Sequence, residues 1–151
     1  MLTLIQGDDF LLKPSKIHVW AAWLNLPAVL RAKLEAILAA DEREKAARFV
    51  FDRDRRAYVA SRGILRQLIA NYVGLAPEML NFTYNKQGKP LLNTDCGGDW
   101  LNFNVSHSNH LALYAFRSCG TVGVDIEYVR DVVDMNQVAA STFSTAENVA
   151  W

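Results

Sequence analysis

The sequence has little of several features that mark special classes of protein. Its 151 residues include only two cysteines, Cys96 and Cys119, and no apolar run approaches the length of a membrane-spanning helix. The first residues, Met1–Thr3, lack the basic start of a secretory signal peptide. We therefore expect a cytoplasmic protein with two free thiols and no membrane partner; a single disulfide is the alternative for the cysteines.

The sequence also lacks a net charge, since 16 basic residues balance 16 acidic ones. A nucleic-acid partner is therefore not expected. The charge is nevertheless uneven: residues 41–66 hold eight basic and five acidic side chains, and residues 120–151 hold one basic and five acidic. Two interpretations stay open. Both segments are solvated helix faces, or the basic one faces phosphates and the acidic one faces a cation.

The chain does contain enough apolar surface for a core. Its composition is 51% hydrophobic and 21% charged, which is typical of a globular domain. A chain of this length buries about two thirds of its unfolded surface. We therefore expect one ordinary domain.

Three short stretches with alternating apolar residues follow one another late in the chain. They cover residues 102–106, 111–116 and 122–127 and predict three strands. A period of two places Asp125 and Glu127 on one face of the third strand. Two such carboxylates suit a hard cation such as Mg2+, which keeps several waters. The alternative is the solvated face of an edge strand, because a bare D-x-E pattern is common.

Two further groups of polar residues offer hydrogen bonds to phosphate oxygens. Ser106 and His107 end the first of these strands, where a ligand can reach both donors. Lys89 follows Gly88 in a turn, and the glycine lets the backbone come close to a ligand. Together with the carboxylate pair, these residues predict a nucleotide or pyrophosphate site.

Most of the remaining periodicity is helical. We expect a strand over 17–24, helices over 27–39 and 54–72, and a short helix that begins at Asp41. Glu44 stands three residues after Asp41, as in a capping box. The short helix carries Lys45, and the long one carries Arg62 on the flank opposite its apolar face.

Four motifs in this sequence resemble those of the 4′-phosphopantetheinyl transferases, specifically the larger surfactin-synthetase type. They are E-K-A-A-R-F-V-F-D-R-D at 44–54, G-K-P at 88–90, F-N-V-S-H-S with V-G-V-D-I-E between 103 and 127, and F-S-T-A-E at 143–147. Four motifs in the expected order and spacing are more specific than any one of them. The resemblance extends from about residue 41 to the last residue.

The resemblance implies an α+β fold of two similar halves related by a pseudo-twofold axis, with coenzyme A bound between them. Residues 1–115 would form the first half, and residues 116–151 would begin the second, which is partial. It also implies a reaction, the transfer of the phosphopantetheine arm of coenzyme A to a serine of an acyl or peptidyl carrier protein.

The resemblance further implies roles for single residues. Asp125 and Glu127 would bind Mg2+ and serve catalysis. The phosphates of coenzyme A would be held by basic and polar side chains, namely Lys45, Lys89, Ser106 and His107, with Arg62 on the helix that lines this side. Glu147 would be a third catalytic carboxylate, or it completes a capping box that starts at Ser144.

One part of the family's pattern is missing. Members of this type continue to a W-x-x-K-E-A-x-x-K motif, whose Glu binds metal or acts as the base, and this sequence ends at Trp151 without it. We therefore expect a truncated enzyme of impaired activity, whose exposed apolar surface favours a homodimer. Two alternatives stay open, a non-catalytic remnant that binds coenzyme A and an unrelated metal-dependent phosphodiesterase.

Overall fold

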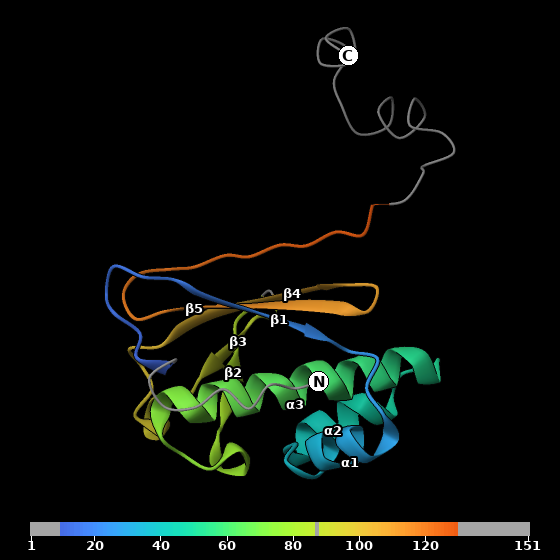
Figure 1. Ribbon diagram of the computed structural model, residues 1–151. Helices are drawn as coiled ribbons and strands as arrows, with labels where there is room; N and C mark the ends of the chain where they lie inside the picture. The colour runs from blue at the N-terminus through green and yellow to red at the C-terminus, as the bar shows by residue number, and fades with distance from the viewer. Residues whose placement is uncertain (1–9, 87, 130–151) are drawn as a thin grey trace, which may run out of the picture.

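The computed structural model describes residues 10–86 and 88–129 and shows an α+β arrangement (Figure 1), as the sequence predicts. In chain order the elements are β1 (His18–Trp23), α1 (Ala28–Ala36), α2 (Ala40–Ala47), α3 (Asp52–Val73), η2 (Pro77–Met79), β2 (Phe82–Tyr84), β3 (Pro90–Leu92), η3 (Thr94–Cys96), β4 (Asn102–Ser108) and β5 (Leu111–Arg117). Within this part of the chain, no helix combines the length and apolar character that a membrane crossing requires.

The strands form one three-stranded antiparallel sheet, in the order β1-β5-β4, and a separate β2–β3 hairpin. β4 and β5 are joined by a tight turn at Asn109, which adopts a positive φ of 54°. β1 pairs with the other side of β5, from His18 opposite Phe116 to Trp23 opposite Leu111. The first strand therefore completes a sheet whose other strands lie far along the chain, and β4 is left at one edge.

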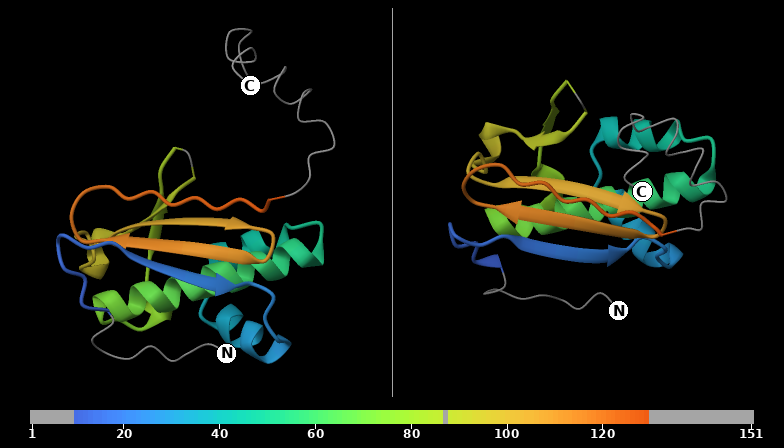
Figure 2. Two further views of the ribbon diagram at one scale, coloured as in Figure 1. Left: turned by 45° about the horizontal axis from the view of Figure 1, so that its top comes forward. Right: turned by 90° about the horizontal axis from the view of Figure 1, so that it is seen from above.

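The long helix α3 covers one face of this sheet (Figures 1 and 2). Asp52 and Asp54 lie in its first turn, where the helix dipole favours negative charge. Gly74 ends the helix in the left-handed region and donates its N–H to the carbonyl of Ala70. The 22 residues between these ends include no proline. The helix is therefore long enough to span the sheet.

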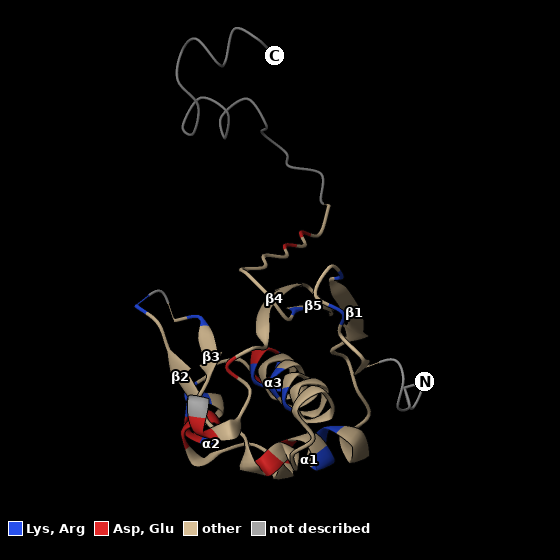
Figure 3. Ribbon diagram, turned by 90° about the vertical axis from the view of Figure 1, so that its left-hand side faces the viewer, with Lys and Arg blue, Asp and Glu red and all other residues tan. Residues whose placement is uncertain are grey.

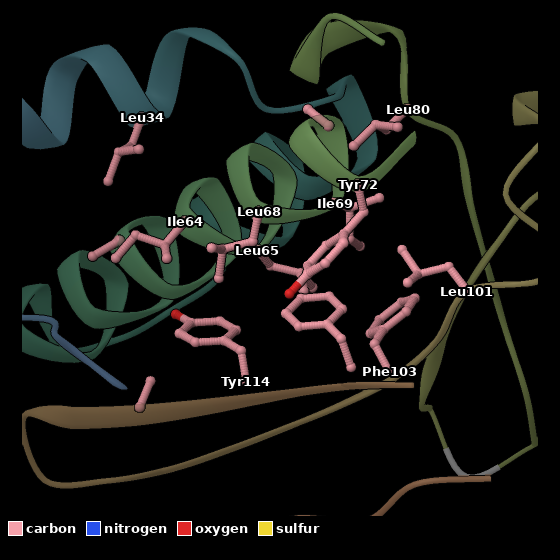
Figure 4. Packing of buried hydrophobic residues seen from close by; sticks show 14 of the residues in the cluster. Leu34, Ile64, Leu65, Leu68, Ile69, Tyr72, Leu80, Leu101, Phe103 and Tyr114 are labelled. Carbon is pink, nitrogen blue, oxygen red and sulfur yellow. The ribbon is translucent and has the colours of Figure 1, made fainter. Parts of the chain in front are cut away.

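The main core lies between α3 and the inner face of the sheet (Figure 4). Tyr72 contacts Phe116 with ring centroids 4.7 Å apart, and Phe103 lies 6.2 Å from Phe116. The buried apolar side chains here come from both layers and include Ile64, Leu65, Leu68, Ile69, Tyr72, Phe103, Ala112, Tyr114 and Phe116. Each large one stabilises the fold by about 1.5–3 kcal/mol when fully buried. This packing fixes the sheet against α3.

The helices α1 and α2 pack on the other side of α3 (Figure 1). A Cβ placed on Gly63 would lie 2.5 Å from the Cβ of Leu34, so glycine is what lets α1 approach α3 this closely. The expected start of α2 at Asp41 is wrong. The helix begins at Ala40, and the side chain of Glu42 accepts the backbone N–H of Ala39 at 2.9 Å. Glu42, rather than Glu44, is thus the glutamate of the cap.

The outer face of the sheet carries the segment that follows β5, which runs across it in an extended conformation (Figures 1 and 2). The third predicted strand, over 122–127, is wrong as a hydrogen-bonded strand. The amides of Val124 and Ile126 bond to side chains of β4 instead of joining a strand ladder. On the same face, β1 leaves Val19 and Trp23 56% and 67% exposed. One face of the sheet is therefore thickly covered and the other only thinly.

Candidate functional site

Two cavities take part of their lining from β4. The larger has a volume of about 590 Å³ and includes His107 and Ser108, and the smaller has a volume of about 230 Å³ and includes residues 103–105. Because β4 lies at the edge of its sheet, ligands can approach both cavities from outside. The edge strand with the motif N-F-N-V-S-H-S is therefore the centre of the candidate site.

The larger cavity lies between the beginning of α3 and the turn after β4. Its lining residues are Phe49, Arg53, Asp54, Ala57, Tyr58, His107, Ser108, Asn109, His110 and Tyr128. His107 and His110 can donate hydrogen bonds to an anion there, and Arg53, which pairs with Asp54 of the same lining at 3.1 Å, is a third donor. Aromatic rings supply its apolar surface. Such a cavity can hold a ring-bearing ligand that also carries negative charge.

Lys45 lies beside the same cavity. Its Nζ is 5.5 Å from the centre of the Tyr58 ring, a cation–π contact that ties α2 to a cavity wall. Burial raises the pKa of Tyr58 to about 12, and the positive charge of Arg62 opposes part of this rise. Tyr58 is therefore a neutral phenol at pH 7 and can donate its proton in a hydrogen bond.

Lys89 belongs to the smaller cavity. That cavity joins the turn of the β2–β3 hairpin to β4 and is lined by Gly88, Lys89, Pro90, Phe103, Asn104 and Val105. Gly88 adopts a positive φ of 78°, and the backbone N–H of Lys89 bonds to Asn85 Oδ1 at 2.9 Å. The turn therefore brings Lys89 to the edge strand.

Ser106 and His107 do not line one cavity together. Successive side chains of a strand point to opposite faces, so His107 lies on the side of α3 and Ser106 lies on the outer face. There the hydroxyl of Ser106 donates to Asp125 Oδ1 at 2.7 Å. The serine is therefore a direct neighbour of the predicted metal ligand.

Asp125 and Glu127 lie on the exposed side of the outer segment. The intervening residues Val124 and Ile126 are half-buried, as a period of two predicts. In Figure 3 the acidic positions of this segment stand well apart from the charged residues around α2 and α3. The two carboxylates thus face outward from the sheet, with Ser106 behind the first.

Arg62 lies away from both cavities, in a buried ionic cluster. Glu42 pairs through one carboxylate oxygen with Arg62 and through the other with Arg66 Nε at 2.6 Å, and these three residues are 1%, 8% and 1% exposed. Arg62 Nη2 donates to the hydroxyl of Tyr84 at 2.7 Å, and its guanidinium lies 4.3 Å from the centre of the Phe82 ring. Arg62 therefore ties the hairpin that carries Lys89 to α2 and α3.

Most of the basic side chains of residues 41–66 form ion pairs with carboxylates of the same or a neighbouring helix. Exposed ion pairs join Arg48 to Glu44, Arg53 to Asp54, Arg55 to Glu35 and Arg56 to Asp52. Two more arginines are buried against Glu42. The basic segment is therefore neither wholly a solvated helix face nor wholly a face toward phosphates, because two of its arginines lie in a buried ionic cluster.

The sequence pattern did not reveal several residues of the larger cavity, among them Arg53, Tyr58 and His110. The polar turn S-N-H at 108–110 was the available signal, since a tight turn beside an edge strand exposes its side chains. The cavity residues at the start of α3, Arg53 and Tyr58, could not be recognised from the sequence, because the sequence does not show which strand packs beside this end of the helix. Glu147, the third predicted catalytic carboxylate, lies outside the described residues.

Comparisons with known proteins agree on one family. The family model described as 4′-phosphopantetheinyl transferase, N-terminal, matches residues 21–118. This range includes the elements from α1 to β5. It therefore also includes the F-N-V-S-H-S motif on β4 and the G-K-P motif in the turn of the hairpin.

Among similar proteins is the 4′-phosphopantetheinyl transferase HetI of Nostoc sp., 37% identical over 132 residues, which are 87% of this chain and 56% of HetI. A phosphopantetheinyl transferase of Thraustochytrium sp. is 31% identical over 75% of this chain and 40% of its own length. The human L-aminoadipate-semialdehyde dehydrogenase-phosphopantetheinyl transferase is 33% identical over 57% of this chain and 28% of its own length. The chain thus spans about half the length of the first of these relatives, and less of the others.

Proposed function

Because this chain belongs to the 4′-phosphopantetheinyl transferase family, we propose that it transfers the phosphopantetheine arm of coenzyme A to a serine of an acyl or peptidyl carrier protein. The single observation that carries this proposal is the edge strand β4. It contributes to a cavity with His107, it adjoins Lys89, and it holds the outward-facing pair Asp125 and Glu127. One strand therefore adjoins both the side chains that we propose for phosphate binding and the candidate metal ligands.

The carboxylate pair fits Mg2+ by its chemistry. Both side chains offer hard oxygen donors on the exposed side of one extended segment, and Asp125 keeps an oxygen besides the one that Ser106 binds. Among residues 10–86 and 88–129, no group of three or more His, Cys, Asp and Glu side chains could hold a metal. A Mg2+ bound here would therefore rely on phosphate and water for its other ligands, as this ion commonly does.

The ion and the basic residues would have separate tasks. Bound Mg2+ supplies positive charge against the pyrophosphate as negative charge builds on the leaving group. His107 and Lys45 would hold phosphates at the larger cavity, where Arg53 is a further donor, and Lys89 would hold them at the smaller cavity.

The serine of the carrier protein must lose a proton as it attacks phosphorus. The bond from this phosphorus to the serine oxygen forms, the bond to the oxygen of the leaving adenosine 3′,5′-bisphosphate breaks, and a base takes the proton. In the family, the Glu of the W-x-x-K-E-A-x-x-K motif binds metal or acts as this base, and this sequence does not include that motif. We propose Glu147 of the F-S-T-A-E motif as a third catalytic carboxylate. Ser144 gives the same glutamate an alternative role in a helix cap.

Mass spectrometry of an apo carrier protein incubated with the chain, coenzyme A and Mg2+ tests the proposal. We expect the carrier to gain the mass of the phosphopantetheine arm, and Asp125→Asn to slow this gain by at least about tenfold. Asp99→Asn is the matched control, because Asp99 is also exposed and lies outside both cavities. Absence of transfer, by this chain alone and with the carboxyl-terminal half of HetI added in trans, would contradict the proposal.

A second candidate function is coenzyme A binding without turnover. It is favoured by the positions of Lys45, Lys89 and His107, all of which lie within the stretch matched by the family model. This candidate predicts that coenzyme A binds and that no carrier protein gains mass. Its binding should weaken in His107→Ala, and an unchanged affinity in that variant would contradict this cavity as the binding site.

Two further expectations accompany the proposal. We place the reaction in the cytoplasm because Cys96 and Cys119 are free thiols, as in proteins of reducing compartments. We also propose a homodimer, since Val19 and Trp23 expose apolar surface on one face of the sheet. Light scattering tests the second expectation, and a monomer across the accessible concentration range would contradict it.

A further inference from the structure

Three alternate side chains of β4 bond to three alternate amides of the outer segment. Asn104 Oδ1 accepts the N–H of Val124 at 3.0 Å, Ser106 Oγ accepts that of Ile126 at 3.2 Å, and Ser108 Oγ accepts that of Tyr128 at 3.0 Å. Each bond joins residues twenty positions apart, so the segment runs parallel to β4 in a fixed register. We call Asn104, Ser106 and Ser108 the polar ladder.

The polar ladder brackets both carboxylates. Asp125 stands between the anchored amides of Val124 and Ile126, and Glu127 stands between those of Ile126 and Tyr128. Ser106, the middle residue of the ladder, makes a second contact, because its hydroxyl donates to Asp125 Oδ1 at 2.7 Å. The backbone on each side of each carboxylate is therefore fixed to the edge strand.

Neighbouring positions show that the ladder is not simply the polar side of a sheet. On β5 the outer face is apolar, with Leu111, Leu113 and Ala115 at the corresponding alternate positions. Asn102 also lies on the outer face of β4, but its side chain donates to the carbonyl of Trp100 and not to the segment. The side chains of β4 that bond to the outer segment are therefore those at positions 104–108, which lie beside Asp125 and Glu127.

We propose that Asn104, Ser106 and Ser108 are positioning residues that set the direction and spacing of the Asp125 and Glu127 carboxylates for Mg2+. The inference rests on the proposed function, because it assigns to the ladder the support of that metal pair. Ligands that bind a metal are oriented by hydrogen bonds from neighbouring residues, and loss of such a bond typically weakens metal binding by roughly 10- to 100-fold. Ser106 thereby acts on the site through Asp125, in addition to any contact with phosphate.

Amide hydrogen exchange of the full chain tests the ladder itself, with no metal or substrate present. We expect Asn104→Ala to speed exchange at the amide of Val124 by about twofold to tenfold, which is the net worth of one hydrogen bond. Asn104→Asp should keep the protection, because its side-chain oxygen still accepts the bond. Asn102→Ala, on the same face of the same strand, should leave Val124 unchanged. An unchanged rate at Val124 in Asn104→Ala would overturn the inference.

Calorimetric titration of MgCl2 into the chain with coenzyme A bound tests the positioning role. We expect Asn104→Ala to raise the dissociation constant of Mg2+ by roughly tenfold and Asn102→Ala to leave it unchanged. A wild-type constant in a variant whose exchange at Val124 has accelerated would overturn the positioning role alone. A wild-type chain that binds coenzyme A with no dependence on Mg2+ would instead overturn the proposed metal site, and the positioning role with it.

Discussion

The two faces of the β1-β5-β4 sheet use charged residues in opposite ways. On the helical side, Glu42, Arg62 and Arg66 are buried and pair with one another. On the outer side, Asp125 and Glu127 are exposed on a segment that short side chains hold to β4. Breaking a buried ion pair leaves an unpaired charge in a poorly polarisable environment, whereas an exposed carboxylate stays hydrated. Loss of one charged partner should therefore destabilise the covered face strongly, whereas the carboxylates of the open face remain in contact with solvent.

The largest expected effect tests the covered face. Arg66→Ala should lower the free energy of unfolding by about 3–5 kcal/mol, because Glu42 loses a partner in the interior. Urea denaturation followed by circular dichroism measures the change. Arg48→Ala is the matched control: its pair with Glu44 is exposed and contributes no more than about 0.5 kcal/mol. Equal losses in the two variants would remove the distinction between the faces.

Two glycines provide the next contrast. Gly63→Ala should cost about 1–3 kcal/mol, because the new methyl group would overlap Leu34 and push α1 away from α3. Gly123→Ala should change stability by less than about 0.5 kcal/mol, because a Cβ there meets no atom within 4 Å. Thermal unfolding of both variants measures the difference. A Gly63→Ala protein as stable as wild type would show that the helices are not packed as tightly as described.

Alkaline pH should act on the covered face as well. Burial raises the pKa of Tyr72 to about 12, and burial likewise raises the pKa of Tyr114. The folded chain then binds more protons than the unfolded chain above about pH 10, so this contribution to stability is complete below about pH 10 and is lost as the pH rises towards about 12. Tyrosinate absorbance and urea denaturation at stepped pH values measure it. Constant stability from about pH 9 to 12 would contradict the burial of these phenols.

The smallest expected effect on stability belongs to the ligand-binding edge. Lys89→Ala should change the free energy of unfolding by less than about 0.5 kcal/mol. It should nevertheless weaken coenzyme A binding by roughly 10- to 100-fold, because a charged hydrogen bond to phosphate is lost. Lys86→Ala is the control, since Lys86 is exposed in the same turn and lines neither cavity. Equal affinities of the two variants would contradict the phosphate contact proposed for Lys89.

Local pattern alone predicted a large part of this fold. The alternation around Phe103 and the helical period between residues 54 and 72 placed β4, β5 and α3 within a few residues of their observed bounds. The motifs also selected Lys89 and His107, and each of these residues lines a cavity beside β4. These features depend on neighbours in sequence, which a periodic pattern reports directly.

Features that depend on distant neighbours were not predictable in the same way. By helical period, Arg62 and Arg66 belong to a solvated flank of α3, and only the approach of α2 and the β2–β3 hairpin buries them against Glu42. An alternating pattern likewise predicts extended backbone at 122–127 but not its partner. The amides of this segment bond to side chains of β4, so the expected strand does not form.

Calorimetric titration of coenzyme A into the chain, with and without Mg2+, tests the proposed site along β4 most directly. We predict binding that strengthens when Mg2+ is present, and a loss of this strengthening in Asp125→Asn. Binding of equal strength under both conditions would contradict the role of the outer carboxylates. No binding by a chain that circular dichroism shows to be folded would contradict the whole site along β4.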